Sequence, residues 1–205
     1  EAASTMGLNH VRTMVMAAAL GGAFRKVEGV NLEQFWRYSL NVAKIARSLA
    51  QTMKVDAGSA FTAGLVHALG DLVMHMGMPD DIRRLDFSVP PLGLDRAKAE
   101  RAMFGYTYAD VSAGFAVKWN FPESIVKALQ YLQAPFEGET YELLAGVLHM
   151  AVWRARAQEV QLDANGMAAT YPDMVALVMG LDLETLLEKD PEDWSSKGEL
   201  GAFIE

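Results

Sequence analysis

Apolar residues recur with a helical period along almost the whole chain, and no segment shows the alternating pattern of a half-buried strand. The clearest example begins after Asn31, which has Gln34 three residues on, as in a helix N-terminus closed by a capping box. One buried face is predicted for Leu32, Phe35, Trp36, Leu40, Ala43, Ala46, Leu49, Ala50 and Met53. The pattern predicts an all-α fold.

The segment 57–76 differs from the others because it is apolar nearly all round and rich in alanine and glycine. Asp56 precedes it as a candidate N-cap, and Pro79 is expected to end it. A helix of this composition is surrounded by other helices, with small residues where backbones approach closely. We therefore expect it to be the central helix of a compact multi-helix bundle.

Further helices are predicted on both sides of this segment. The pattern places them at about 5–24, 95–104, 108–119, 123–133, 141–161, 173–179 and 183–188. Asn165-Gly166 is interpreted as a turn, and Asp80-Asp81 after Pro79 as helix-start charges in a polar loop. Residues 1–189 are predicted to form one domain, and 190–205 a loosely held tail.

Composition narrows the classes of function. Of the 205 residues, 51% are hydrophobic, but no uncharged apolar run reaches the roughly eighteen residues of a membrane span. The net charge of −8 argues against a nucleic-acid partner, and the absence of cysteine excludes disulfides and thiolate ligands. Cytoplasm is the expected location. From Gly180 to Glu205 there are eight acidic residues and two lysines, which is interpreted as a solvated C-terminus.

No phosphate-binding glycine loop, zinc-protease motif or nucleophile elbow is present. The candidate chemistry lies in the segment from Phe61 to Asp71, which contains His67-Ala68. Together with Phe35–Leu40, Ala109–Ala113 and Trp119–Glu123, this segment resembles the HDOD domain, a helical bacterial signalling module related to the HD phosphohydrolases. The resemblance covers about residues 1–160, and several ordered motifs agree at compatible spacing.

The resemblance implies where metal ligands would stand, because HD enzymes use His and Asp side chains to hold divalent cations that activate water. In this sequence those positions carry other residues. The first His corresponds to Tyr38, the Asp of the His-Asp pair to Ala68, and a later His to Tyr108. A His-His pair corresponds to Leu132-Gln133, and the closing Asp falls near Val152. Of this set only His67 remains, so a degenerate, vestigial metal position and no cofactor are expected.

A different set of metal ligands is conceivable on the helix that carries His67. His67, Asp71 and His75 are spaced four residues apart on one helix face, but the outer two would be about 12 Å apart at ~1.5 Å per residue. At most two could share an ion, fewer than the three protein ligands of catalytic zinc. We expect instead a hydrogen-bonded core His67, with Asp71 and His75 emerging into water as only weak metal candidates.

The expected function is a non-catalytic signalling module that acts through protein–protein contacts, with no nucleic-acid or membrane partner. The alternatives are a diverged metal-dependent phosphohydrolase and a nucleotide-sensing domain without hydrolysis. HDOD domains also carry an N-terminal helical lobe before the segment that resembles Thr5–Leu20, and this sequence lacks it. If the lobe is absent from the natural protein, an apolar face around Met6, Val11 and Val15 would favour self-association into a homo-oligomer.

Overall fold

The computed structural model describes residues 24–135 and 141–182, and every regular element in these ranges is an α-helix. The first, α2 (Leu32–Thr52), begins as predicted at Asn31, whose Oδ1 accepts a hydrogen bond from the Gln34 N–H at 3.1 Å. The predicted capping box is only half formed. The Gln34 side chain turns away and donates to Glu159 Oε2 at 3.4 Å.

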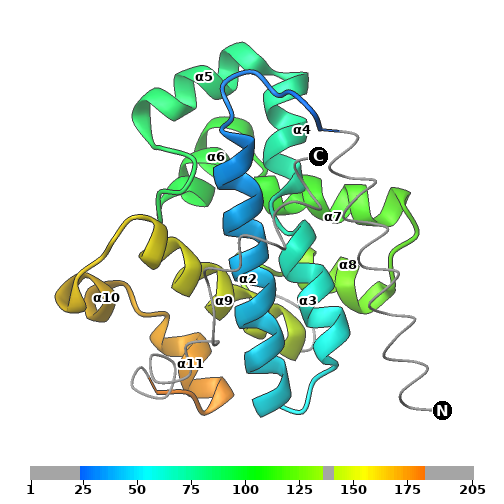
Figure 1. Ribbon diagram of the computed structural model, residues 1–205, viewed down its shortest axis with the longest axis vertical. Coiled ribbons are helices and arrows are strands. Elements are labelled where there is room, and N and C mark those ends of the chain that lie inside the picture. Colours follow the sequence, from blue (N-terminus) through cyan, green and yellow to red (C-terminus); the bar gives the residue numbers. More distant parts are fainter. Residues whose placement is uncertain (1–23, 136–140, 183–205) are drawn as a thin grey trace.

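The centre of the bundle is α2, which packs along α3 (Ala57–Val66) and α9 (Leu143–Glu159) (Figure 1). The backbones of α2 and α3 approach closely because the residues at their crossing are small. A Cβ added to Gly64 would lie 2.6 Å from Ala43 Cα. The Asp56 carboxylate caps α3 by accepting from the Ser59 N–H at 2.7 Å. Both the small-residue contact and this cap were predicted.

The prediction of one central helix over 57–76 is wrong, because the segment forms two helices, α3 and α4 (Leu69–Gly77), with a break at His67-Ala68. Ser112 of α7 (Tyr108–Lys118) interrupts the ladder of backbone hydrogen bonds. Its Oγ accepts from the Gly70 N–H at 2.8 Å and lies 2.7 Å from the His67 carbonyl oxygen. A side chain inserted in this way is a recognised cause of helix kinks.

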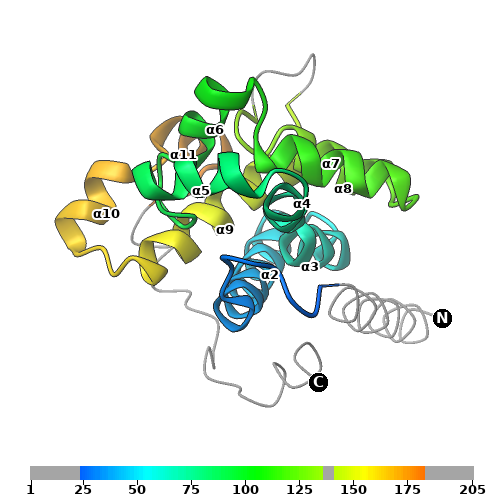
Figure 2. The same cartoon turned by 90° about the horizontal axis from the view of Figure 1, so that it is seen from above.

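Gly70 allows α4 and α7 to meet at this break, and the two helices lie against each other in Figure 2. A Cβ on Gly70 would collide with the Tyr108 carbonyl oxygen and lie 2.8 Å from the Ser112 nitrogen. The kink and the helix contact therefore depend on the same glycine.

Two helices were not predicted. Pro79 begins α5 (Pro79–Ser88), so Asp80 and Asp81 lie in its first turn as the expected helix-start charges, but in a helix rather than a loop. The predicted turn at Asn165-Gly166 lies inside α10 (Ala164–Thr170), where Asp163 caps the helix by accepting from the Gly166 N–H at 2.7 Å.

The remaining helices agree with their predicted positions. They are α6 (Arg96–Phe104), α8 (Glu123–Gln130) and α11 (Asp173–Met179). Both α8 and α9 are a few residues shorter than predicted. The predicted helices at 5–24 (apart from Phe24, which is not helical) and 183–188, and the boundary at 189, lie outside the described residues.

The segment Ala57–Gly77 is long and apolar enough to cross a membrane by composition. However, 67% of its most apolar window is buried by the rest of the fold, as in the core helix of a globular domain. The segment is therefore weak evidence for a span.

Candidate functional site

The structure brings together three residues at positions where the HD resemblance expects metal ligands. They come from α2 (Tyr38), the α3–α4 break (His67) and α7 (Tyr108), and each is at least 99% buried. The ring centroids of Tyr38 and His67 are 5.1 Å apart, and those of His67 and Tyr108 are 6.3 Å apart, both edge to face. The break in the central helix thus places His67 between two tyrosines.

Both ring nitrogens of His67 are occupied. Nδ1 lies 2.7 Å from the Gly64 carbonyl oxygen and must donate to it, which leaves Nε2 as an acceptor from the Tyr38 O–H at 3.2 Å. Burial lowers the pKa of His67 to about 3, so the ring is neutral, and burial raises the pKa of the Tyr38 hydroxyl, so it keeps its proton. The prediction of a hydrogen-bonded core His67 is confirmed.

Arg156 of α9, which was not predicted as a site residue, completes this cluster. Its Nε donates to Tyr38 Oη at 3.1 Å, and its guanidinium lies 5.1 Å from the centre of the Tyr108 ring. The side chain is only 5% exposed. The available signal was an arginine within an apolar stretch of the long helix, four residues after Val152.

The positions of the other expected ligands lie beside the Arg156 cluster, which we define as Tyr38, His67, Tyr108 and Arg156. Gln133 donates from Nε2 to Tyr108 Oη at 3.0 Å. Leu132 is buried, and its carbonyl oxygen accepts from His149 Nδ1 at 2.8 Å.

These residues do not fit a divalent metal. The one imidazole has its free lone pair bound to Tyr38, and the same tyrosine oxygen accepts from a guanidinium whose positive charge would repel a second cation. Nowhere in residues 24–135 and 141–182 do three His, Asp or Glu side chains converge in an arrangement that could hold an ion.

Asp71 and His75 lie apart from His67, on α4, and the expectation that they emerge into water is wrong. His75 is 4% exposed and the Asp71 side chain 14%. Both belong to a second cluster around Arg96 of α6. Asp71 pairs with Arg96 of α6, and His75 lies against Asp86 of α5, so these two helices cover both residues.

The Arg96 cluster comprises Arg96, His75 and the carboxylates of Asp71, Asp86 and Glu100. Arg96 lies 2.6 Å from Asp86, 2.9 Å from Glu100 and 3.6 Å from Asp71. His75 Nδ1 donates to the Asp71 carbonyl oxygen at 2.8 Å, and its Nε2 lies 3.3 Å from Asp86 Oδ2.

Burial raises the pKa of both Asp71 and Glu100, although Arg96 opposes the rise in each case. The second oxygen of Glu100 accepts from the Tyr108 N–H at 2.7 Å, which also favours its charged form. Tyr108 therefore joins the two clusters, with its backbone in one and its side chain in the other.

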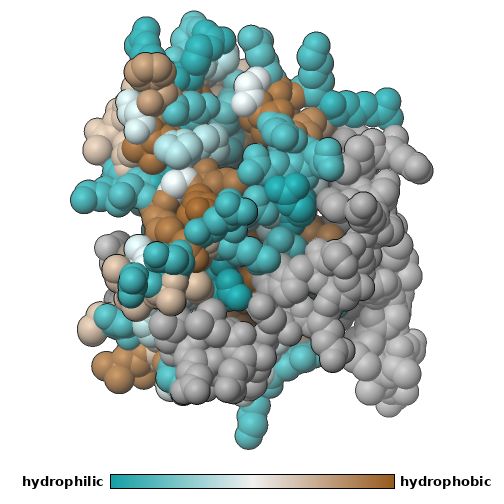
Figure 3. All heavy atoms as spheres, turned by 60° about the vertical axis from the view of Figure 1, so that its left-hand side comes forward, coloured by the Kyte–Doolittle hydropathy of each residue, from teal (hydrophilic) through white to brown (hydrophobic). Residues whose placement is uncertain are grey.

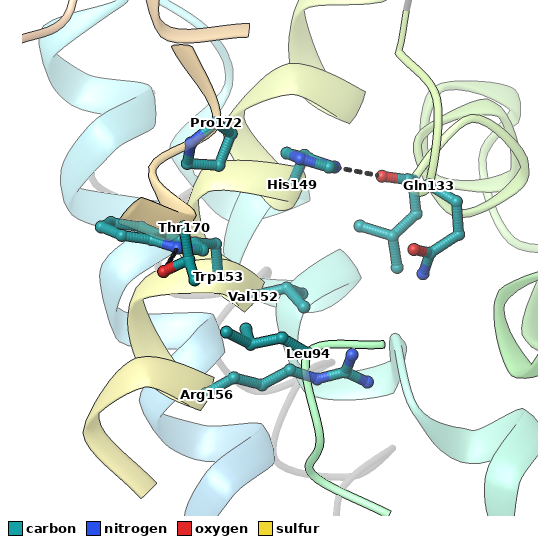
Figure 4. A pocket seen from close by; sticks show the side chains of 9 residues that line it. Leu94, Gln133, His149, Val152, Trp153, Arg156, Thr170 and Pro172 are labelled. Carbon is teal, nitrogen blue, oxygen red and sulfur yellow. Dashed lines mark hydrogen bonds between the residues drawn. The ribbon is translucent and has the colours of Figure 1, made fainter. Parts of the chain in front are cut away.

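A cavity of about 230 Å³ opens beside the Arg156 cluster (Figure 4). Its polar lining side chains are Gln133, His149, Arg156 and Thr170. Its apolar walls are Leu94, Leu132, Val152, Trp153 and Pro172. The Trp153 Nε1–H donates to Thr170 Oγ1 at 3.2 Å and so ties α9 to the end of α10.

Comparison with known proteins places these observations in a family. Residues 1–135 match the description of the HDOD domain. A search of curated proteins gives no match.

Several solved structures are similar. A candidate phosphohydrolase from Shewanella amazonensis SB2B is 30% identical, with a TM-score of 0.75 over 100% of this chain and 74% of that one. A candidate signal transduction protein from Marinobacter aquaeolei VT8 is 22% identical, with a TM-score of 0.72 over 96% of this chain and 45% of that one. The response regulator MmoQ from Methylococcus capsulatus strain Bath is 22% identical, with a TM-score of 0.56 over 79% and 62%.

The last two similarities concern the fold alone. The match to residues 1–135 covers well over half of the sequence, and the buried His67 lies within it. The chain belongs to the HDOD family.

Proposed function

We propose that this chain is a non-catalytic bacterial signalling module that acts in the cytoplasm through protein–protein contacts. The observation that carries the proposal is the guanidinium of Arg156, which stands with two tyrosines at the position that metal ligands would need. The positive charge of this arginine side chain would repel a divalent metal ion at the same site, so hydrolysis by a metal-activated water is not expected.

The kinds of protein with the same fold support this role. One similar chain is a response regulator and another a candidate signal transduction protein, and this chain spans 62% and 45% of their lengths. The chain similar at 30% identity is a candidate phosphohydrolase, which is the specific reason to keep hydrolysis as the second function to test.

The surface of α11 offers a contact face for a partner. Met174, Leu177 and Val178 are 67, 74 and 51% exposed, and their spacing places them on one side of the helix. Grouped apolar side chains in such exposed positions are typical of interaction sites.

The first test separates a module from an enzyme. The purified chain is incubated with Mn²⁺ or Mg²⁺, its bound metal is measured after desalting, and turnover of bis(p-nitrophenyl) phosphate is followed. We expect no stoichiometric metal and no turnover, also in Ala68→Asp, which restores the His-Asp pair but leaves Arg156 in place. Stoichiometric metal that is lost in His67→Ala, together with turnover, would establish the hydrolase instead.

The second test concerns the partner. Cross-linking and capture from cells is expected to recover a protein with the unmodified chain, and much less of it with Leu177→Asp. Phe87→Asp is the matched control, because Phe87 is 95% exposed on α5, away from α11. Equal recovery with all three proteins would remove α11 from the proposal, and capture of no protein would contradict the proposed function.

A further inference from the structure

Arg156 differs from an ordinary buried arginine because it forms no ion pair with any Asp or Glu of the described residues. Its hydrogen bonds go from Nε to Tyr38 and from Nη1 to the Gly93 carbonyl oxygen at 3.4 Å, and both acceptors are neutral. The carboxylates of Asp71 and Glu100 act on it only at longer range, because both pair directly with Arg96 instead. A buried charge without a counter-ion is costly.

The cavity lies beside Arg156, so an anion that enters the cavity from solvent could pair with its guanidinium. Arg156 is part of its wall, and within residues 24–135 and 141–182 Nη2 makes no hydrogen bond, so this nitrogen keeps both donors for a ligand. Figure 4 shows the side chains of Arg156 and Val152, both from α9, beside Leu94, which precedes α6. The site thus combines a fixed cation with apolar walls, as in many pockets for small molecules.

The other polar groups that line the cavity restrict the chemical class of anion that can bind there. His149 donates from Nδ1 to the Leu132 carbonyl oxygen, and burial lowers the pKa of His149, so its Nε2 remains a hydrogen-bond acceptor. Gln133 donates one N–H to Tyr108, which leaves its Oε1 as a second acceptor and its other N–H as a donor. An acceptor favours a ligand hydroxyl and disfavours further negative charge.

Charge and size lead to the same class of ligand. One guanidinium without an ion-pair partner matches one negative charge on a ligand, and its planar donors match a carboxylate. The cavity of about 230 Å³ is smaller than the roughly 300 Å³ at which pockets for drug-sized ligands begin. We propose that the cavity binds a small organic monoanion, a carboxylate that also carries a hydroxyl, with Arg156 holding the carboxylate.

The proposal does not depend on the protein-binding role, since partner capture and ligand binding are measured separately. On the side that carries α5 and α10, apolar and polar surface are mixed (Figure 3).

The probes are glycolate and lactate, added to the full chain while the arginine Nε–Hε signals are followed by NMR. We expect the Arg156 signal to shift saturably with a millimolar dissociation constant. Glycolamide and lactamide, which have nearly the same shape without the charge, should bind at least about tenfold more weakly. The Arg156 signal is assigned by its absence in Arg156→Met.

Val152→Phe tests the cavity without touching the arginine. It fills the space beside Arg156, so glycolate and lactate should lose at least about tenfold in affinity. Arg83→Met, which removes the same charge from an arginine whose side chain is 65% exposed, should leave binding unchanged.

Four results would overturn the proposal. They are no saturable shift with either carboxylate, amides that bind equally well, binding that survives Val152→Phe, and tighter binding of inorganic phosphate than of lactate. If Arg156→Met does not fold, Val152→Phe and the amides still decide between these outcomes.

Discussion

Arg96 and Arg156 are the two buried arginines of the described residues, and they are compensated in opposite ways. Arg96 forms ion pairs with three carboxylates and so links α4, α5 and α6. Arg156 lies among neutral tyrosines, beside a cavity. The two clusters are separated by only four residues along the central segment, since His67 belongs to one and Asp71 to the other. Burial of an arginine therefore does not by itself indicate its role. The presence or absence of an ion-pair partner distinguishes a structural arginine from one that can bind a ligand.

The largest expected loss of stability comes from replacing Arg96, the arginine that forms ion pairs. Arg96→Met leaves Asp71, Asp86 and Glu100 without their shared counter-ion, and loss of one partner from a buried ion pair costs about 3–5 kcal/mol of unfolding free energy. Arg156→Met leaves no ion-paired carboxylate behind and removes the hydrogen bonds to Tyr38 and Gly93, so it should cost only about 1–2 kcal/mol.

Urea denaturation of both variants measures this difference. Arg83→Met, on an exposed ion pair, serves as a control and should change stability by less than about 1 kcal/mol. Equal losses for Arg96→Met and Arg156→Met would break the comparison, because they would mean that Arg156 too has a bound counter-ion within the chain.

A slightly smaller effect is expected at the junction between the clusters. Gly70→Ala introduces a methyl group against the backbone of Tyr108 and Ser112, and overpacking of this kind costs about 1–3 kcal/mol. Gly114→Ala is the matched control, since nothing lies within 4 Å of the added methyl group and alanine favours the helix by about 0.8 kcal/mol. Thermal unfolding should show opposite signs for the two variants, and a neutral Gly70→Ala would contradict the close contact of α4 with α7.

The smallest expected effect is the pH dependence of stability that His67 contributes. Burial lowers the pKa of His67 from 6.5 to about 3, so the unfolded chain binds a proton at this residue that the folded chain does not. Stability is therefore lost as the pH falls from 6.5 toward 3, with a limiting slope of about 1.4 kcal/mol per pH unit. The raised pKa values of Asp71 and Glu100 act with the opposite sign, since their protonated forms favour the folded state.

His67→Gln isolates the histidine contribution. Between about pH 7 and pH 5 the unmodified chain should lose roughly 2 kcal/mol more of unfolding free energy than His67→Gln does. The carboxylates and His149 are common to both proteins and cancel in the difference. Parallel pH profiles would show that His67 is protonated within the folded protein and that its hydrogen bond to Tyr38 is misassigned.

The helices were predictable wherever the apolar period was long or a capping residue was visible, as at Asn31 and Asp56. Two short helices were missed because Pro79 and Asn165-Gly166 were interpreted as breaks, although proline is suited to the first turn and Asp163 supplies a cap. The kink at His67-Ala68 could not be predicted from local sequence, because its cause is a side chain 42 residues after Gly70.

The missing metal ligands of the candidate site were predicted from the sequence, whereas the arginine that stands beside them was not. Resemblance located Tyr38, His67 and Tyr108, which converge as the family positions imply. Arg156 lies four residues after Val152, the position expected for the closing Asp, and carries the charge opposite to a ligand, so a search for ligands does not find it. The predicted exposure of Asp71 and His75 assumed a helix end in water, whereas Arg96 pairs with Asp71 and Asp86 with His75.

The hydroxyl of Ser112 also has a consequence for the order in which the protein opens. The Gly70 amide has no partner in its own helix and depends on α7 for its hydrogen bond. Deuterium exchange at this one amide should therefore follow the separation of α7 from the core, whereas amides within α3 follow their own helix. A single peptide group thus reports whether two elements far apart in sequence remain docked.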